Sequence, residues 1–134
     1  MIQKVKAGKE IVVTSKNKVG TLSAVSKALA DRGINIVALS AQAAGGVALM
    51  NLVVDDHLRA GDALRKKGFQ VQENDVVLVH VEDKPGVLRQ LTQTLAAKKI
   101  DLMNIYGSTT TTYAPCLLVL SSSNNQKAIV ALRK

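Results

Sequence analysis

Hydrophobic and polar positions alternate along the chain with two different periods. Residues Glu10–Thr14 form a short apolar run rich in β-branched side chains, which is typical of a buried strand. After a polar loop, Leu22, Val25 and Leu29 recur at helical spacing and form one apolar stripe. Gly33 is placed to end that helix in the left-handed conformation. The chain is therefore expected to begin its first half with a strand and an amphipathic helix.

The segments Ile34–Gln42 and Val47–Val54 are both apolar, and the turn residues at 44–46 between them predict a β-hairpin. Asp55-Asp56 then supplies an N-cap and negative charge for a second helix. Phe69–Gln72 alternates as an edge strand does. The predicted order is strand, helix, strand, strand, helix, strand.

The same pattern returns after a constant shift of 66 residues, which brings Gly20 onto Gly86 without a gap. This agreement over most of the chain indicates an internal duplication. The second copy is predicted to have strands at Val76–Val81, Asp101–Thr110 and Ala114–Ser121, a helix with the stripe Leu88, Leu91 and Leu95, and a last helix at Gln126–Arg133 with Asn124 as its cap.

The second copy has no counterpart of the fourth strand, because Lys134 aligns with Gly68. We expect Ile2–Val5 to supply that strand, in cis or from a partner chain, with Ala7-Gly8 as a turn before the first strand. An unpaired edge would otherwise remain. The fold class is then α+β, with two ferredoxin-like βαββαβ units and antiparallel sheets, the second unit lacking its own C-terminal strand. The units are residues 9–74 and 75–134, and residues 1–6 complete the second.

Composition narrows the classes of protein. Hydrophobic residues make up 47% of the chain, which is enough for a packed core. The single cysteine, Cys116, excludes an intrachain disulfide. No apolar run reaches the roughly 18 residues of a membrane span, and the charged N-terminus lacks an apolar signal core. A cytoplasmic protein is the expectation.

Few residues suggest catalytic or metal chemistry. His57 is expected in solvent at the start of a helix, and His80 as a hydrogen-bonded residue of a strand. Neither has a partner at metal-ligand spacing, so neither a metal nor another cofactor is expected. No nucleophile–base set or pair of acids is readable, which argues against an enzyme.

The loop Glu82-Asp83-Lys84-Pro85-Gly86-Val87-Leu88 closes an apolar strand and opens an amphipathic helix. Together with Leu95-Ala96 and Ile100-Asp101-Leu102 it resembles an ACT domain. The first copy resembles one through Asn17-Lys18-Val19-Gly20-Thr21-Leu22 and Ala28–Ile36. This resemblance to a tandem ACT protein implies a regulatory module that binds an amino acid or similar effector where units meet. It also implies a homodimer or higher oligomer that acts on a separate metabolic enzyme or regulator.

The resemblance also implies which positions contact the ligand. They are Asn17, Lys18, Gly20, Thr21, Leu22, Asn35 and Ile36 in the first unit and Asp83, Gly86, Val87, Leu88 and Asp101 in the second. A helix N-terminus suits a carboxylate, and an asparagine amide can both donate to and accept from a zwitterion. Val19 departs from the expected proline, and acids replace the asparagines in the second unit. The two sites are therefore not equivalent, which favours the first unit or a site shared across an interface.

A nucleic-acid-binding module is the alternative, since RNA-recognition domains share the ferredoxin-like order and the formal net charge is +8. Those domains stack bases on strand aromatics. The central strands Glu10–Thr14, Val47–Val54 and Val76–Val81 carry none. The basic residues are also scattered along the chain. Binding of nucleic acid is therefore the weaker interpretation.

Overall fold

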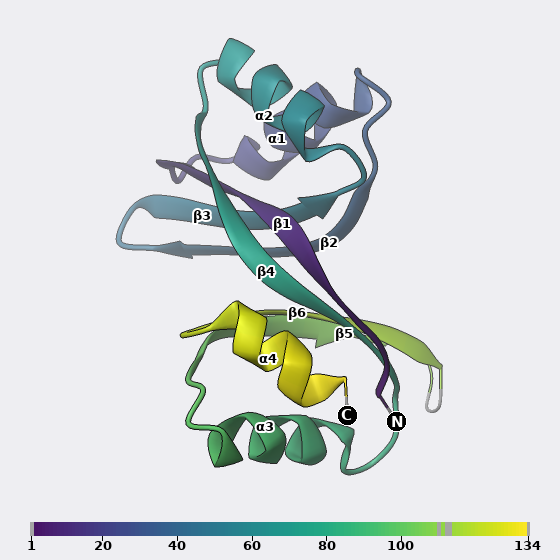
Figure 1. Ribbon diagram of the computed structural model, residues 1–134. Coiled ribbons are helices and arrows are strands. Elements are labelled where there is room, and N and C mark those ends of the chain that lie inside the picture. Colours follow the sequence, from purple (N-terminus) through teal and green to yellow (C-terminus); the bar gives the residue numbers. More distant parts are fainter. Residues whose placement is uncertain (1, 110, 112–113, 134) are drawn as a thin grey trace. The chain divides into compact units, whose positions relative to one another are not determined.

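The computed structural model describes residues 2–109, 111 and 114–133. They form two compact units, a first unit of Lys9–Asn74 and a second unit of Asp75–Lys134 together with Met1–Gly8. In each unit two helices lie side by side on one face of the strands (Figure 1). The mixed helix and strand content and the antiparallel pairing confirm the predicted α+β class.

The first unit contains a complete strand, helix, strand, strand, helix, strand order. Its strands lie in the order β2-β3-β1-β4, and both pairs that involve β3 are antiparallel. The elements are β1 (Ile2–Lys16), α1 (Thr21–Ala30), β2 (Ile36–Ala44), β3 (Val47–Val54), α2 (His57–Lys66) and β4 (Gln70–Glu82).

Local sequence explains the ends of these elements. Gly33, after α1, has φ of 69°, and Gly45 and Gly46 have φ of 58° and 81° in the hairpin turn, a region that L side chains rarely adopt. Asp56 caps α2, because its side chain accepts a hydrogen bond from the Arg59 N–H. The core of the first unit is built from one face of β1 and β3 against α1 and α2. Its members include Ile11, Val13, Val25, Leu29, Met50, Leu52 and Leu64.

The second unit repeats this arrangement with α3 (Val87–Ala97), β5 (Leu102–Ser108), β6 (Pro115–Ser122) and α4 (Asn125–Leu132). Its strand order is β1-β4-β6-β5. Asn124 caps α4 by accepting from the Lys127 N–H, as predicted. The core joins β4 and β6 to α3 and α4, and it contains Val77, Val79, Leu91, Leu95, Leu120, Ala128 and Leu132.

The start of β1 belongs to the second unit. Val5 is only 5% exposed and packs in the core of that unit. The Arg133 guanidinium donates two hydrogen bonds to the Val5 carbonyl oxygen, from Nε at 3.1 Å and from Nη2 at 2.9 Å. The strand order places this segment beside β4, where a fourth strand of the second unit stands.

Two expected boundaries within strands are wrong. Ala7-Gly8 is not a turn, because β1 continues from Ile2 to Lys16. A β-carbon on Gly8 would lie 2.7 Å from Leu78 Cδ1, so the glycine serves close packing and not a reversal of the chain. Gln70–Gln72 and Val76–Val81 likewise belong to one strand, β4, whose polar middle is exposed to solvent, and Phe69 precedes it. The strand expected at Asp101–Thr110 ends at Ser108 as β5, and Thr110 lies outside the described residues.

Candidate functional site

The loop between β1 and α1 is held by its own hydrogen bonds. Thr21 Oγ1 donates to the Lys18 carbonyl oxygen at 2.9 Å, and the Asn17 N–H donates to the Gly46 carbonyl oxygen at 2.9 Å. Gly20, with φ of 89°, stands at the N-cap of α1, and no side chain makes a cap hydrogen bond there. The first N–H groups of a helix lack partners within the helix. The loop therefore brings a fixed backbone turn and a helix N-terminus together.

A cavity of about 400 Å³ opens between this loop and the ends of β2 and β3, and we call it the loop cavity. It gathers five of the residues implied by the resemblance: Asn17, Lys18, Gly20, Thr21 and Leu22. The remaining lining residues, Ser23, Ala41, Gln42, Ala43, Ala48 and Met50, were not identified from sequence. Only the strand order, which sets the hairpin beside β1, could have indicated them.

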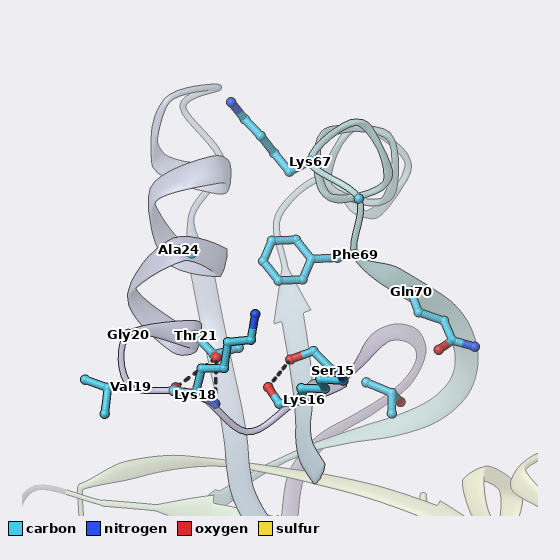
Figure 2. A pocket seen from close by; sticks show the side chains of 12 residues that line it. Ser15, Lys16, Lys18, Val19, Gly20, Thr21, Ala24, Lys67, Phe69 and Gln70 are labelled. Carbon is cyan, nitrogen blue, oxygen red and sulfur yellow. Dashed lines mark hydrogen bonds between the residues drawn. The ribbon is translucent and has the colours of Figure 1, made fainter. Parts of the chain in front are cut away.

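A second cavity of about 520 Å³ shares Lys18, Gly20 and Thr21 with the loop cavity but extends toward the end of α2. We call it the Phe69 cavity. Figure 2 shows the Phe69 ring facing α1 across it, and the hydrogen bonds between Thr21 and Lys18 at its edge. Fewer of the residues expected at a ligand line this cavity, so the loop cavity is the better candidate.

Asn35 and Ile36 lie at the opposite end of the first unit from Asn17. Ile36 pairs with Val54 at the start of β2, whereas the end of β2 and the end of β1 both pair with Val47, on either side of β3. At roughly 3.3 Å per residue, the length of β2 separates the two asparagines by about 25 Å. The structure therefore does not bring Asn17 and Asn35 together within one unit.

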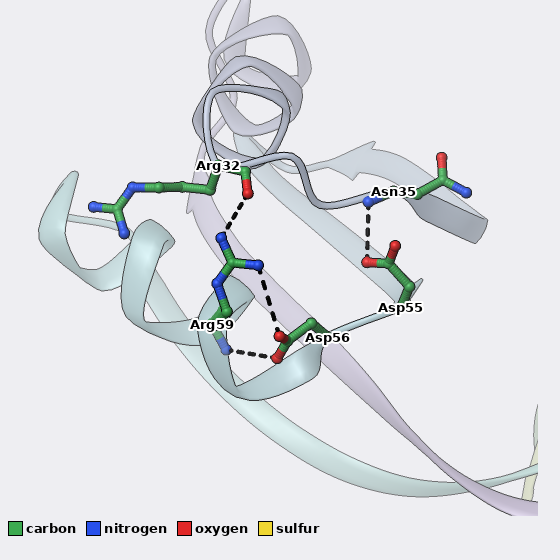
Figure 3. A network of polar contacts seen from close by, with 5 residues as sticks. All are labelled: Arg32, Asn35, Asp55, Asp56 and Arg59. Atoms are coloured by element: carbon green, nitrogen blue, oxygen red, sulfur yellow. Dashed lines mark hydrogen bonds and ion pairs between the residues drawn. The ribbon is translucent and has the colours of Figure 1, made fainter.

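The backbone of Asn35 takes part in a local network instead. Its N–H donates to Asp55 Oδ1 at 3.1 Å, and the Asp55 N–H donates to the Asn35 carbonyl oxygen at 3.1 Å. Figure 3 shows the Asn35 side chain pointing away from Asp55, and Arg59 joined to the Arg32 carbonyl oxygen at 2.6 Å. These contacts fasten α1, β2 and α2 to one another.

The second unit presents its candidate residues differently. Val87 is 6% exposed and belongs to the core, whereas Leu88 is exposed. Gly86 stands at the N-cap of α3 with φ of 93°. The Asp83 N–H donates to the Ala114 carbonyl oxygen at 3.0 Å, and the Asp101 N–H donates to Ser123 Oγ at 2.9 Å. Since Asp83 follows the end of β4 and Asp101 precedes β5, these two acids also lie at opposite ends of their unit.

His57 opens α2 and is partly exposed, as expected, and its Nδ1 also lies 2.6 Å from Glu73 Oε2, a partner that the sequence did not indicate. The expectation for His80 is wrong. His80 Nδ1 is buried without a hydrogen-bond partner, whereas a bonded ring was expected. For His57 the partner, Glu73, is distant in sequence.

Cys116 is buried, and burial raises the pKa of its thiol. Its Sγ donates to the Ser108 carbonyl oxygen at 3.2 Å. Among the residues that the structure describes, no group of three or more His, Cys, Asp or Glu side chains could hold a metal ion. Within the same part of the chain, every helix is too short or too polar to span a membrane.

Comparison with known proteins places these features in a family. The family model described as ACT domain matches residues 9–66 and again residues 76–134. Protein BT0572 from Bacteroides thetaiotaomicron is similar in structure, with a TM-score of 0.89 and 26% identity over 96% of this chain and 88% of that one. No curated protein matches the chain.

A second group of similar structures consists of regulatory subunits. That of aspartate kinase from Thermus thermophilus has a TM-score of 0.70 and 18% identity, and the match covers 98% of this chain and 96% of that one. The subunit from Thermus flavus has a TM-score of 0.65 and 17% identity over 98% and 96% of the two chains. At these identities the likeness shows a shared fold.

Proposed function

Since the chain belongs to the ACT domain family, which each of its halves matches separately, we propose that it is a non-enzymatic regulatory protein whose first unit binds an amino acid or a similar small effector. The observation that carries this proposal is the loop cavity, where five residues of the β1–α1 loop and the first turn of α1 meet the ends of β2 and β3. The fold shared with aspartate kinase regulatory subunits supports a regulatory role.

The cavity suits the two charged ends of an amino acid. Leu22 and Ser23 line it from the first turn of α1, where backbone N–H groups and the helix dipole favour a carboxylate. The side-chain oxygen of Asn17 can accept a hydrogen bond from the ammonium group. A bound ligand connects the loop to the hairpin, so it stabilises the arrangement in which both are in place.

Regulation by such a protein requires a partner, and we propose that a second copy of the chain is one. β2 is an edge strand of the first unit, with free backbone groups along one side. Val37 and Leu39 on this strand are 51% and 49% exposed. Pairing of β2 with another copy covers these side chains. Sedimentation velocity of the wild type and of Leu39→Lys tests this pairing. The wild type is expected to form dimers and Leu39→Lys to be monomeric. A monomeric wild type would contradict the pairing.

A melting-shift screen tests the proposed ligand class. At least one of the twenty standard amino acids, at millimolar concentration, is expected to raise the melting temperature of the wild type, because a ligand bound only to the folded state stabilises it. The same ligand should have no effect on Ala43→Leu, which fills the loop cavity, and its usual effect on Thr109→Leu, the matching change in the second copy. No shift with any amino acid, or a normal shift in Ala43→Leu, would contradict the proposal.

A further inference from the structure

The charge that lines the loop cavity is of one sign, positive. None of the described residues that line it carries a carboxylate, and Lys18 is the charged side chain among them. An ammonium or guanidinium group on a ligand side chain would find no acid there and would face the Lys18 charge. Moving a cation out of water costs free energy when no anionic or polar group replaces its hydration.

The part of the cavity opposite the loop is apolar. Ala48 and Met50 of β3 are 7% and 2% exposed and belong to the core of the first unit. Leu22 of α1 and Ala43 of β2 line the same hollow. A carboxylate placed against these methyl and thioether groups would lose water in the same way. Apolar ligand groups are favoured there, because their contact removes apolar surface from water.

We propose that the loop cavity selects amino acids whose side chains carry no charge, with the α-carboxylate at the loop and the side chain toward Ala48 and Met50. This selectivity rests on the proposed function of the same cavity and adds the ligand class to it. Lys18 then pairs with the α-carboxylate at the entrance. Basic amino acids bind weakly because the described lining has no carboxylate to pair with their side-chain charge. Acidic amino acids bind weakly because, in that lining, no hydrogen-bond donor lies beside Met50 to pair with their side-chain carboxylate.

The internal duplication supplies a variant for testing this selectivity. Asp83 occupies in the second copy the position of Asn17 in the first, and Gly86 repeats the left-handed cap of Gly20 with φ of 93°. The loop backbone therefore tolerates an aspartate at this position. Asn17→Asp places a carboxylate in the lining of the loop cavity without a change in side-chain size.

Isothermal titration calorimetry with each of the twenty amino acids tests the selectivity in the wild type, in Asn17→Asp and in Asn74→Asp. Asn74 is exposed on β4 and does not line the loop cavity, so it controls for the added charge. The wild type is expected to bind an uncharged amino acid at least about tenfold more tightly than lysine or arginine. Asn17→Asp should reduce that ratio, and Asn74→Asp should leave it unchanged.

The outcomes separate the selectivity from the function. Tightest binding of lysine, arginine, aspartate or glutamate to the wild type would overturn the selectivity and leave the amino-acid-binding function standing. An unchanged ratio in Asn17→Asp would also overturn it. Binding of none of the twenty would overturn the function, and the selectivity with it.

Discussion

Two glycines show how the surroundings of a residue decide what it contributes. Gly107 lies in β5, and a β-carbon there would stand 2.8 Å from the Leu117 carbonyl oxygen, which cannot move without a shift of β6. Gly61 lies in α2, and a β-carbon there would meet only the end of the Arg65 side chain, with Nη1 at 3.0 Å. The same added methyl group therefore has opposite consequences.

Gly107→Ala is expected to lower the free energy of unfolding by about 1–3 kcal/mol, because the methyl group displaces backbone. Gly61→Ala is expected to raise it by up to about 1 kcal/mol, because alanine favours the helix and Arg65 can rotate away. Urea unfolding followed by circular dichroism measures both. Equal stability of Gly107→Ala and the wild type would contradict the close packing of β5 on β6.

A second prediction at this scale concerns Asp31. The hydrogen bond and charge of Lys27, whose Nζ lies 2.7 Å from Asp31 Oδ2, lower the pKa of the Asp31 carboxyl below its ordinary value. Because the pKa is lower in the folded state than in the unfolded state, the ionised carboxyl stabilises the fold when the pH is above the unfolded-state pKa. This contribution is lost as the pH falls through the folded-state pKa. In Lys27→Met the pKa of Asp31 should rise toward that of a free aspartate in an NMR titration. An unmoved pKa would show that Lys27 is not the cause.

Residue types alone predicted the features that depend on neighbours in sequence. The caps at Asp56 and Asn124 and the left-handed Gly33 belong to this group. The environment of His80 could not be predicted, because the burial of its ring nitrogen depends on distant segments. The same limit applies to the ring of His57, whose partner Glu73 lies on another element.

At the scale of elements, the sequence predicted which unit the N-terminal strand serves but not where that strand ends. The sequence predicted that Ile2–Val5 serves the second copy as a strand, and the start of β1 lies in that unit beside β4. The turn at Ala7-Gly8 was wrong, because a glycine suits a turn and a close approach equally well. The contact of Gly8 with Leu78, which decides between them, is tertiary.

Removal of residues 1–6 should destabilise the second unit, because it deletes Val5 from the core and uncovers the edge of β4. Arg133→Ala should do so more mildly, by about 1–3 kcal/mol, because two hydrogen bonds to the Val5 carbonyl oxygen are lost. Chemical denaturation measures both, with Arg32→Ala, an exposed residue just after α1, as the control. A truncated chain with unchanged melting would contradict this role of the strand.

At the scale of the whole molecule, the two copies have diverged around a common loop. The first copy has Lys16 and Lys18, whereas the second has Glu82 and Lys84, which form an ion pair at 3.4 Å. Val87 is buried, whereas the corresponding Thr21 lines the loop cavity. These differences support one ligand site per chain, in the first unit.

The candidate site was only half predictable from sequence. The loop residues Asn17–Leu22 carry a motif and could be identified without a structure. The opposite wall, from Ala41 to Met50, has no motif, and it joins the site only because the strand order sets the hairpin beside the loop. Asn35 carries the motif but lies at the far end of β2, so sequence spacing alone misplaces it relative to Asn17.

The stoichiometry of amino-acid binding, measured by equilibrium dialysis with the tightest-binding amino acid in radiolabelled form, tests the loop cavity as the ligand site. Saturable binding of one molecule per chain is expected, and it should be lost in Ala43→Leu and retained in Thr109→Leu. Absence of saturable binding for every amino acid at millimolar concentration, or equal binding by Ala43→Leu, would contradict this assignment.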